Sequence, residues 1–254
     1  MNKSVIQNKT MFEQHYQYMV DLQSTNNITE LQSTCNRFSL EQGFDNYIYG
    51  ARISGSLRNP TYIVINGYPD EWRQHYEDSD YLHIDPTVTH CFSQTLPLFW
   101  QDIDIKKINH HKVFSEAADF GIISGVSIPV HCIRGGTAML SLSSHQQDQK
   151  IQRQLIDRLA ICHLFANYLH EAVLRIAEEN PQLHMNSKLL SKREKECLLW
   201  ITEGKTTWEI SKILNIAERT VSFHVNNAIQ KLDVTNRQQA VARAITLGHI
   251  EPLI

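Results

Sequence analysis

Three aromatic side chains with polar tips are spaced four residues apart, a short distance before an acidic residue. Tyr68, Trp72 and Tyr76 would lie along one side of a helix, and Asp85 follows them. The phenol hydroxyls and the indole N–H are hydrogen-bond donors, whereas the Asp85 carboxylate is an acceptor. An exposed helix seldom spends Trp and Tyr on one face, and a buried one seldom lies beside an unpaired acid. The residues therefore indicate either a polar binding site or aromatic core whose tips are satisfied by backbone or water.

A second set of candidate contacts lies near the C-terminal end. Residues 190–250 contain four short helical patterns, and the second and third are joined by the short turn NIAERT. This is the plan of a helix-turn-helix unit, whose second helix enters the major groove of DNA. The outward face carries amides suited to base edges and cations suited to phosphates, although a solvated face would explain any one of them. The candidate DNA contacts are Lys212, Arg219, Thr220, Ser222, Phe223, Asn226, Asn227, Gln230 and Lys231.

Apolar periodicity predicts the frame that positions these side chains. Alternating apolar residues indicate strands at residues 45–53, 60–66, 125–133 and 137–144, with a turn at Gly135-Gly136. Helical spacing occurs at residues 11–42, 69–79, 110–120 and 150–176. The mixture predicts an α+β chain: an N-terminal α/β/α sandwich around an antiparallel sheet, and a C-terminal all-α helix-turn-helix domain of four helices.

Local capping signals and a proline divide the chain. Pro181 interrupts a helical pattern and polar residues follow it, so we predict domains at residues 1–177 and 190–254, joined by a linker at 178–189. Ser191 and Glu194 form the sequence pattern of a capping box, and Gly204 occupies a position where a helix should end. Thr206 or Thr207 can begin the next helix.

Composition limits the class of protein. The chain has 254 residues and a net charge of −3, and its two parts differ in sign. Residues 1–187 hold 14 Lys+Arg against 20 Asp+Glu (net −6), whereas residues 188–254 hold 10 against 7 (net +3), as expected if only the tail meets a polyanion. An unevenly charged solvated surface is the alternative. No apolar stretch suits a membrane span or a signal peptide, and five scattered cysteines suit a reducing compartment, so we expect a cytoplasmic protein with free thiols.

Three motifs that suggest catalysis or metal binding are better explained otherwise. His110-His111 lies at a polar helix start, where a solvated pair is expected instead of a metal site. Cys91 beside His90 cannot aim its thiol at that ring merely by adjacency. The two neighbouring glycines at 135 and 136 lack the context of a phosphate-binding loop. We therefore expect no catalytic residue, no metal and no cofactor.

The C-terminal string from LSKREKECLLW to NNAIQKL resembles the DNA-binding domain of the LuxR family. The positions that carry the resemblance are Glu194, Leu198, Gly204, Thr220, Val221, His224, Lys231 and Leu232. The resemblance implies binding of double-stranded promoter DNA and a dimerisation surface on the last helix, for which this chain offers Val241, Ala244, Ile245 and Leu247.

The segment YPDEWRQHY, the following DPTVTHC and the later LPLFW resemble the autoinducer-binding domain of quorum-sensing receptors. The resemblance implies that Asp85 accepts the amide N–H of an N-acyl-homoserine lactone, that Trp72 donates to the lactone carbonyl and that Tyr68 donates to the amide carbonyl. It gives Ser141 the amide or 3-position oxygen, and it makes Tyr76 and Trp100 apolar walls. The acyl channel would be formed by Ile48, Gly50, Val88, Val113 and Ile122, and reshaped by Ser127.

The combined prediction is a cytoplasmic quorum-sensing transcription factor, not an enzyme. We expect it to bind a lactone of medium to long chain, about ten to twelve carbons by resemblance, to form a homodimer, and to meet RNA polymerase at a promoter, in solution and not at a membrane. The alternative is an orphan regulator that answers to a foreign lactone, another neutral amphiphile or no ligand. A lactone-degrading enzyme with a DNA-binding tail would need a nucleophile and base or a metal cluster, which the sequence does not offer.

Overall fold

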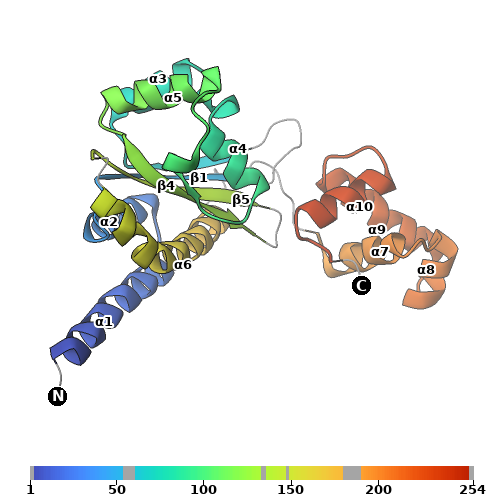
Figure 1. Cartoon of the computed structure of the whole chain (residues 1–254). Coiled ribbons are helices and arrows are strands. Elements are labelled where there is room, and N and C mark those ends of the chain that lie inside the picture. The colour runs from blue at the N-terminus through green and yellow to red at the C-terminus, as the bar shows by residue number, and fades with distance from the viewer. Residues whose placement is uncertain (1–2, 54–60, 133–135, 147–148, 180–189, 252–254) are drawn as a thin grey trace. The chain divides into compact units, whose positions relative to one another are not determined.

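The computed structural model describes residues 3–53, 61–132, 136–146, 149–179 and 190–251. The chain divides into two compact units, the first containing the elements as far as α6 and the second containing α7 to α10 (Figure 1). Helix α6 ends at Glu179, two residues into the predicted linker. The rest of that linker, including Pro181, and the predicted turn residue Gly135 lie outside the described residues.

A five-stranded antiparallel sheet forms the centre of the first unit. Its order is β2-β1-β5-β4-β3, with bounds β1 (Asn46–Ile53), β2 (Thr61–Asn66), β3 (Leu98–Phe99), β4 (Ser124–His131) and β5 (Thr137–Ser144). Strands β4 and β5 pair in a register that places Ser127 opposite Ser141, and Leu98 of β3 pairs with Ser127 from the other side. The four longer strands confirm the sequence patterns. Strand β3 was not predicted, because two residues are too short for an alternating pattern.

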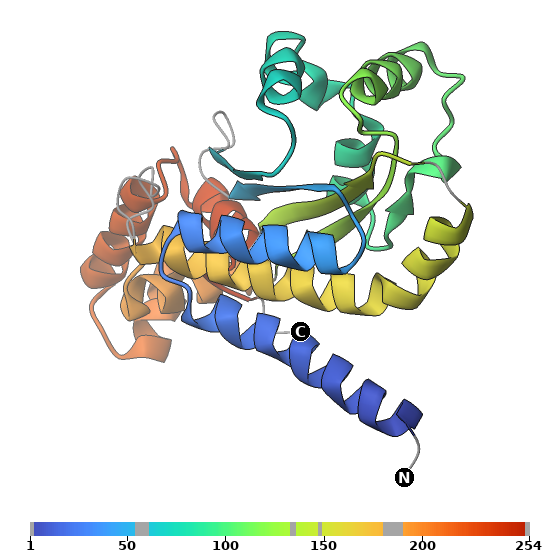
Figure 2. The ribbon, with the colours of Figure 1, turned by 90° about the vertical axis from the view of Figure 1, so that its left-hand side faces the viewer.

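Helices cover both faces of this sheet, which confirms the α/β/α sandwich. Figures 1 and 2 show α1 (Lys3–Ser24), α2 (Ile28–Glu41) and α6 (Gln149–Glu179) on one side, and α3 (Asp70–Asp78), α4 (Pro86–Ser93) and α5 (Ile108–Asp119) on the other. On the first side Phe38 stacks on Phe165 with ring centroids 3.7 Å apart, so α2 and α6 share a dry core.

The predicted helix at residues 11–42 is in fact two helices. The chain breaks after α1, and the Asn27 side chain then accepts the Glu30 backbone N–H and caps the start of α2. Helix α4 was not predicted either. It begins at Asp85-Pro86, where an acidic cap followed by proline is a helix-start signal that we had assigned only to ligand binding.

The second unit consists of four helices, as predicted: α7 (Lys192–Thr202), α8 (Thr207–Leu214), α9 (Glu218–Lys231) and α10 (Arg237–Thr246). Both bonds of the Ser191–Glu194 capping box are present, and Thr206 instead of Thr207 caps α8. Gly204 follows α7 with φ of +75°, a conformation that favours glycine. Asn215 adopts the left-handed conformation and turns the chain from α8 towards α9.

Candidate functional site

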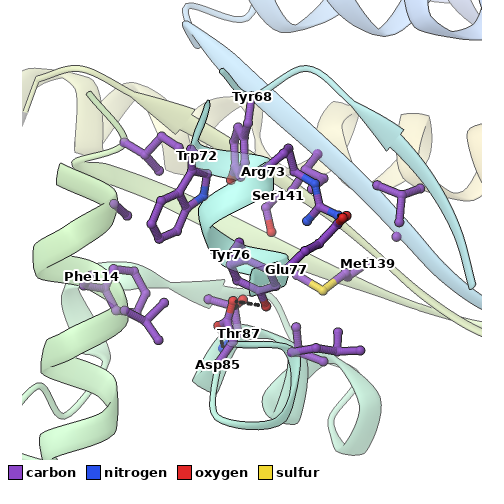
Figure 3. A pocket seen from close by; sticks show the side chains of 18 of the residues that line it. Tyr68, Trp72, Arg73, Tyr76, Glu77, Asp85, Thr87, Phe114, Met139 and Ser141 are labelled. Carbon is purple, nitrogen blue, oxygen red and sulfur yellow. Dashed lines mark hydrogen bonds and ion pairs between the residues drawn. The ribbon is translucent and has the colours of Figure 1, made fainter. Parts of the chain in front are cut away.

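A cavity of about 330 Å³ lies between the sheet and helices α3, α4 and α5. Figure 3 shows Tyr68, Trp72, Tyr76, Asp85 and Ser141 around it. Alternate side chains of a strand point to the same face of a sheet, which explains why the strands contribute residues two apart. These pairs are Ile48 and Gly50 on β1, Tyr62 and Val64 on β2, and Met139 and Ser141 on β5.

Asp85 is a buried acceptor at the edge of this cavity. Its side chain caps α4: Oδ1 accepts the Thr87 backbone N–H at 2.8 Å and the Thr87 hydroxyl at 2.7 Å. Oδ2 accepts the Tyr76 hydroxyl at 2.9 Å, as the dashed line in Figure 3 indicates. An ionised carboxylate has about four lone-pair positions, so Oδ2 keeps acceptor capacity for a further donor.

Within the part of the chain that the structure describes, no cation is paired with Asp85. The residue is 9% exposed, and none of the ion pairs formed by the described residues includes it. Burial raises the pKa of Asp85, and the hydrogen bonds from Thr87 and Tyr76 oppose that shift only in part. A neutral donor arriving from the cavity would therefore stabilise a charge that the protein leaves partly unsatisfied.

Trp72 and Tyr76 on α3, and Tyr68 two residues before that helix, present different groups to the cavity. Trp72 is 3% exposed, and its indole N–H has no hydrogen-bond partner in the described part of the chain. Burial raises the pKa values of Tyr68 and Tyr76, and the Asp85 charge adds to the effect, so both phenols remain hydroxyl donors at neutral pH. The expectation that Tyr76 is only an apolar wall was incomplete, because its hydroxyl is bonded to Asp85.

A chain of hydrogen bonds behind the cavity orients Ser141. The Trp100 indole N–H donates to Ser127 Oγ at 2.9 Å, and Ser127 Oγ lies 2.7 Å from Ser141 Oγ. If Ser127 donates its own proton to Ser141, the Ser141 hydroxyl is free to donate into the cavity. Ser127 itself is fully buried and does not line the cavity, so it does not reshape the channel directly as we had expected.

The other candidate ligand residues meet in the same place. Apart from Ser127, all the candidate ligand residues proposed from the sequence line this cavity, including Val88, Val113 and Ile122. Thr87 was missed although it bonds Asp85, and its position two residues after an acidic cap is the signal that could have revealed it. Other lining residues were not singled out as ligand contacts from the sequence: Arg73, Glu77, Asp80, Leu82, Phe92, Phe114 and Met139.

One part of the cavity wall is charged. Arg73 forms an ion pair with Glu77 one turn later on α3, and its guanidinium lies 5.5 Å from the centre of the Tyr76 ring. Asp80 also lines the cavity, as do the exposed side chains of Tyr62 and Val64. Other lining residues, such as Trp100 and Val113, are almost completely buried. The cavity wall therefore combines buried apolar side chains with a few charged ones.

Helix α9 carries the candidate nucleic-acid contacts. Arg219, Ser222, Phe223, Asn226 and Gln230 are exposed on it, while Thr220 and Asn227 are half-buried. Val221 and Ala228 are buried against the other helices of the unit, so the polar set occupies the opposite side of α9. Lys212 is exposed on α8 and lies over the Trp208 ring, with its Nζ 5.7 Å from the ring centre.

Lys231 has a partner within the unit that the sequence did not indicate. Its Nζ lies 2.8 Å from Oε2 of Glu194, which is 3% exposed. Burial alone would raise the pKa of Glu194, but the Lys231 ammonium and the Ser191 capping bonds outweigh it and lower that pKa. Arg237, the first residue of α10, likewise donates to the Lys205 carbonyl, between α7 and α8, at 3.0 Å. Both cations therefore hold helices together, in addition to any contact with DNA.

Among the described residues no cluster of His, Cys, Asp and Glu has the arrangement of a metal site. The five cysteines are free, and burial raises the pKa values of Cys91 and Cys162 to about 12, which keeps them protonated. None of the helices in the described segments is long and apolar enough to cross a membrane.

Comparison with known proteins shows the same two-part organisation. Residues 27–173 match the family model described as "Autoinducer binding domain", and residues 188–244 match "Bacterial regulatory proteins, luxR family". The transcriptional activator protein VanR of Vibrio anguillarum is 34% identical over 229 residues, which is 89% of this chain and 92% of VanR. SolR of Ralstonia solanacearum, also a transcriptional activator, is 38% identical over 209 residues, 82% of this chain and 86% of SolR.

A solved structure is also similar. The crystal structure of Escherichia coli SdiA matches with a TM-score of 0.75 and 25% identity, covering 94% of this chain and 98% of SdiA. The two family matches and the extent of the similarity to VanR identify the family, which is one of transcriptional regulators and not of enzymes. The chain therefore belongs to the LuxR family of transcriptional regulators and combines an autoinducer-binding domain with a helix-turn-helix DNA-binding domain.

Proposed function

We propose that this regulator binds an N-acyl-homoserine lactone in the cavity beside Asp85 and, as a homodimer, regulates transcription from promoter DNA. The observation that carries the proposal is the buried Asp85 carboxylate, which faces a cavity and has no cationic partner among the described residues. An amide N–H is the neutral donor that such an acceptor requires. The long acyl chain would then fill the apolar part of the cavity.

The polar groups of the cavity match those of such a ligand one by one. Asp85 Oδ2 accepts the amide N–H, and the free indole N–H of Trp72 donates to the lactone carbonyl. The Tyr68 hydroxyl donates to the amide carbonyl, and Ser141, oriented by Ser127, donates to the amide or 3-position oxygen. Each donor remains protonated at neutral pH, because tyrosine, tryptophan and serine lose no proton there.

The rest of the lining suits the acyl chain. Tyr76 and Trp100 bound the head of the ligand, while Ile48, Gly50 and Val88 line the channel. A Cβ built on Gly50 would have its nearest neighbour at 4.0 Å, the Met139 side chain, so the absent side chain leaves space for the ligand. The space beside Gly50 supports the proposal that the acyl chain of the ligand is of medium to long length.

The second unit would carry the output. Two α9 helices of a homodimer would dock on half-sites about one turn of DNA apart, roughly 10 bp. Val241 and Ile245 on α10 are partly exposed and suit the dimer contact. VanR and SolR are activators, which supports activation through RNA polymerase. We place this action in the cytoplasm, where promoter DNA is found.

Extraction of bound small molecules tests the ligand directly. The full chain is produced with a mixed panel of lactones of different chain length, and its extract is examined by mass spectrometry. We expect a lactone in amounts equal to the protein, and much less in the Asp85→Asn variant. Equal retention by that variant, or an extract without lactone, would contradict the proposal.

One observation favours a second candidate, a regulator that answers to another neutral amphiphile. Arg73, Glu77 and Asp80 all line the cavity, and their charged groups can bind hydroxyl groups. Adding monoacylglycerols to the same panel separates the candidates, because they lack the amide N–H that Asp85 would accept. Enrichment of a monoacylglycerol over every lactone would favour this alternative.

A further inference from the structure

A carboxylate outside the cavity links the two helices that carry much of its wall. Glu116 on α5 accepts with one oxygen, Oε2, from His75 Nε2 and from the Tyr81 hydroxyl, each at 2.5 Å. His75 belongs to α3, and Tyr81 begins the short 3₁₀ helix η1 (Tyr81–His83) that follows α3. None of the three residues lines the cavity. They therefore join α3 to α5 from behind.

The two donors to Glu116 also pack beside the indole of Trp72. The Trp72 ring centre lies 5.9 Å from that of His75, 6.1 Å from that of Tyr81 and 5.6 Å from that of Phe120, which follows the last residue of α5. His75 and Tyr81 are in edge-to-face contact at 5.8 Å. The direction of the Trp72 N–H is therefore fixed by rings that Glu116 holds in place.

The His75–Glu116 part of the link lies close to water, which limits the contribution of that ion pair to folding, whereas Tyr81 is buried. The side chains of His75 and Glu116 are 42% and 31% exposed, and exposed ion pairs stabilise proteins little. The hydrogen bonds from His75 and then Tyr81 lower the pKa of Glu116, so the acceptor is ionised at neutral pH. A contact that adds little stability but fixes two helices is suited to positioning.

We propose that Glu116 is a positioning residue for ligand recognition: by joining His75 and Tyr81 it fixes the Trp72 N–H towards the head of the ligand. The inference rests on the proposed lactone-binding function, and it assigns the discrimination of the lactone carbonyl to a residue that touches no ligand. Glu116 should matter for ligands with a carbonyl at that point and not for ligands without one.

Two ligands that share the same acyl chain and amide test this. One is an N-acyl-homoserine lactone, and the other is the matching N-acyl-cyclopentylamine, whose ring has no carbonyl for Trp72. Affinities are measured for the full chain and for Glu116→Gln, which retains size but loses the charge. Asp119→Asn is the matched control, because Asp119 is an exposed carboxylate on the same helix.

We expect Glu116→Gln to weaken lactone binding about tenfold, the value of one well-placed hydrogen bond, and to leave cyclopentylamine binding within about twofold. In a Trp72→Phe background the same substitution should have no further effect on the lactone. Equal weakening for both ligands, or an effect that persists without the indole, would overturn the inference. Tyr81→Phe removes one donor and leaves the carboxylate, and a smaller loss confined to the lactone is expected from it even if Glu116→Gln fails to fold.

The proposed function and this inference fail in different ways. Asp85→Asn should weaken both ligands, because both contain the amide N–H. If it weakens neither, the proposed function is wrong. If it weakens both while Glu116→Gln does not distinguish them, only the role of Glu116 is wrong.

Discussion

Replacement of Asp85 by Asn should remove most of the stabilisation by ligand without weakening the free protein. Asn is close to Asp in shape, and its carbonyl oxygen can still accept the Thr87 N–H at the start of α4. Burial raises the pKa of Asp85, which means that its ionised form costs folding stability at neutral pH. The uncharged amide avoids this cost, but its Nδ2 cannot accept the Tyr76 hydroxyl as Oδ2 does. The two effects oppose each other, so the unfolding temperature of the free variant should stay close to that of the wild type.

Ligand affinity, in contrast to the stability of the free protein, should fall strongly in the Asp85→Asn variant. A hydrogen bond to a charged group contributes about 1.5 to 3 kcal/mol, so its loss weakens binding about 10- to 100-fold. At a hundredfold excess over the dissociation constant a ligand stabilises the wild type by about 2.7 kcal/mol, whereas after a hundredfold loss of affinity about 0.4 kcal/mol remains. For a protein of this size these values correspond to shifts of about 5 to 11 °C and about 1 to 2 °C.

Scanning fluorimetry with and without lactone measures both effects in one experiment. Asp119→Asn, an exposed substitution of the same kind, should behave as the wild type. Asp85→Ala should also lose the ligand shift, but it should in addition destabilise the free protein by about 1 kcal/mol because the cap of α4 is removed. A wild-type ligand shift in Asp85→Asn would refute the reasoning, and so would a large loss of stability in its free form.

Three further outcomes are expected. Lactone affinity should fall as the pH is lowered through the pKa of Asp85, which lies above the ordinary value for aspartate. Over the same pH range the free protein should become more stable, because the buried carboxylate loses its charge. Calorimetric titration at several pH values checks the affinity, and an increase of affinity in acid would contradict the prediction. Lys231→Met should destabilise the second unit by about 3 kcal/mol, because it leaves the buried Glu194 carboxylate without its cation, and denaturant unfolding would show no change if the pair were unimportant. Arg219→Gln should weaken binding to all DNA sequences and reduce the slope of log affinity against log salt concentration by about one, whereas Asn226→Ala should mainly reduce the preference for the specific site. Gel shifts at several salt concentrations distinguish the two variants, and identical behaviour would contradict the assigned roles.

The fold was predictable where local signals and periodicity agreed. Three of the four helices of the second unit begin at a side-chain cap, namely Ser191, Thr206 and Asn236, and the apolar spacing of all four is regular. The longer strands alternate or are continuously apolar, as buried strands do. Strand β3 and the break before Asn27 were missed, because a two-residue strand exists only through its pairing with β4 and a single cap hardly interrupts a helical pattern.

The sequence indicated which residues lie at the cavity, but not which hydrogen bonds join them. The strand residues Ile48 and Ser141, which the resemblance assigned to the ligand site, both line the cavity. The sequence could not show that Ser127 bonds Ser141 from behind, because that contact depends on the register of β4 and β5. The link from Glu116 to His75 spans 41 positions, and no local pattern reports a contact of that separation.

Asp85 has two roles, ligand binding and helix capping, and together they restrict which substitutions can be accepted at this position during evolution. The carboxylate that faces the cavity also begins α4, so most replacements would disturb a helix as well as a signal. Asn, Ser and Thr can begin a helix without a negative charge. A related protein that no longer binds an amide ligand can therefore carry Asn, Ser or Thr at this position without losing the helix start. A related protein that still binds such a ligand has little freedom at this position.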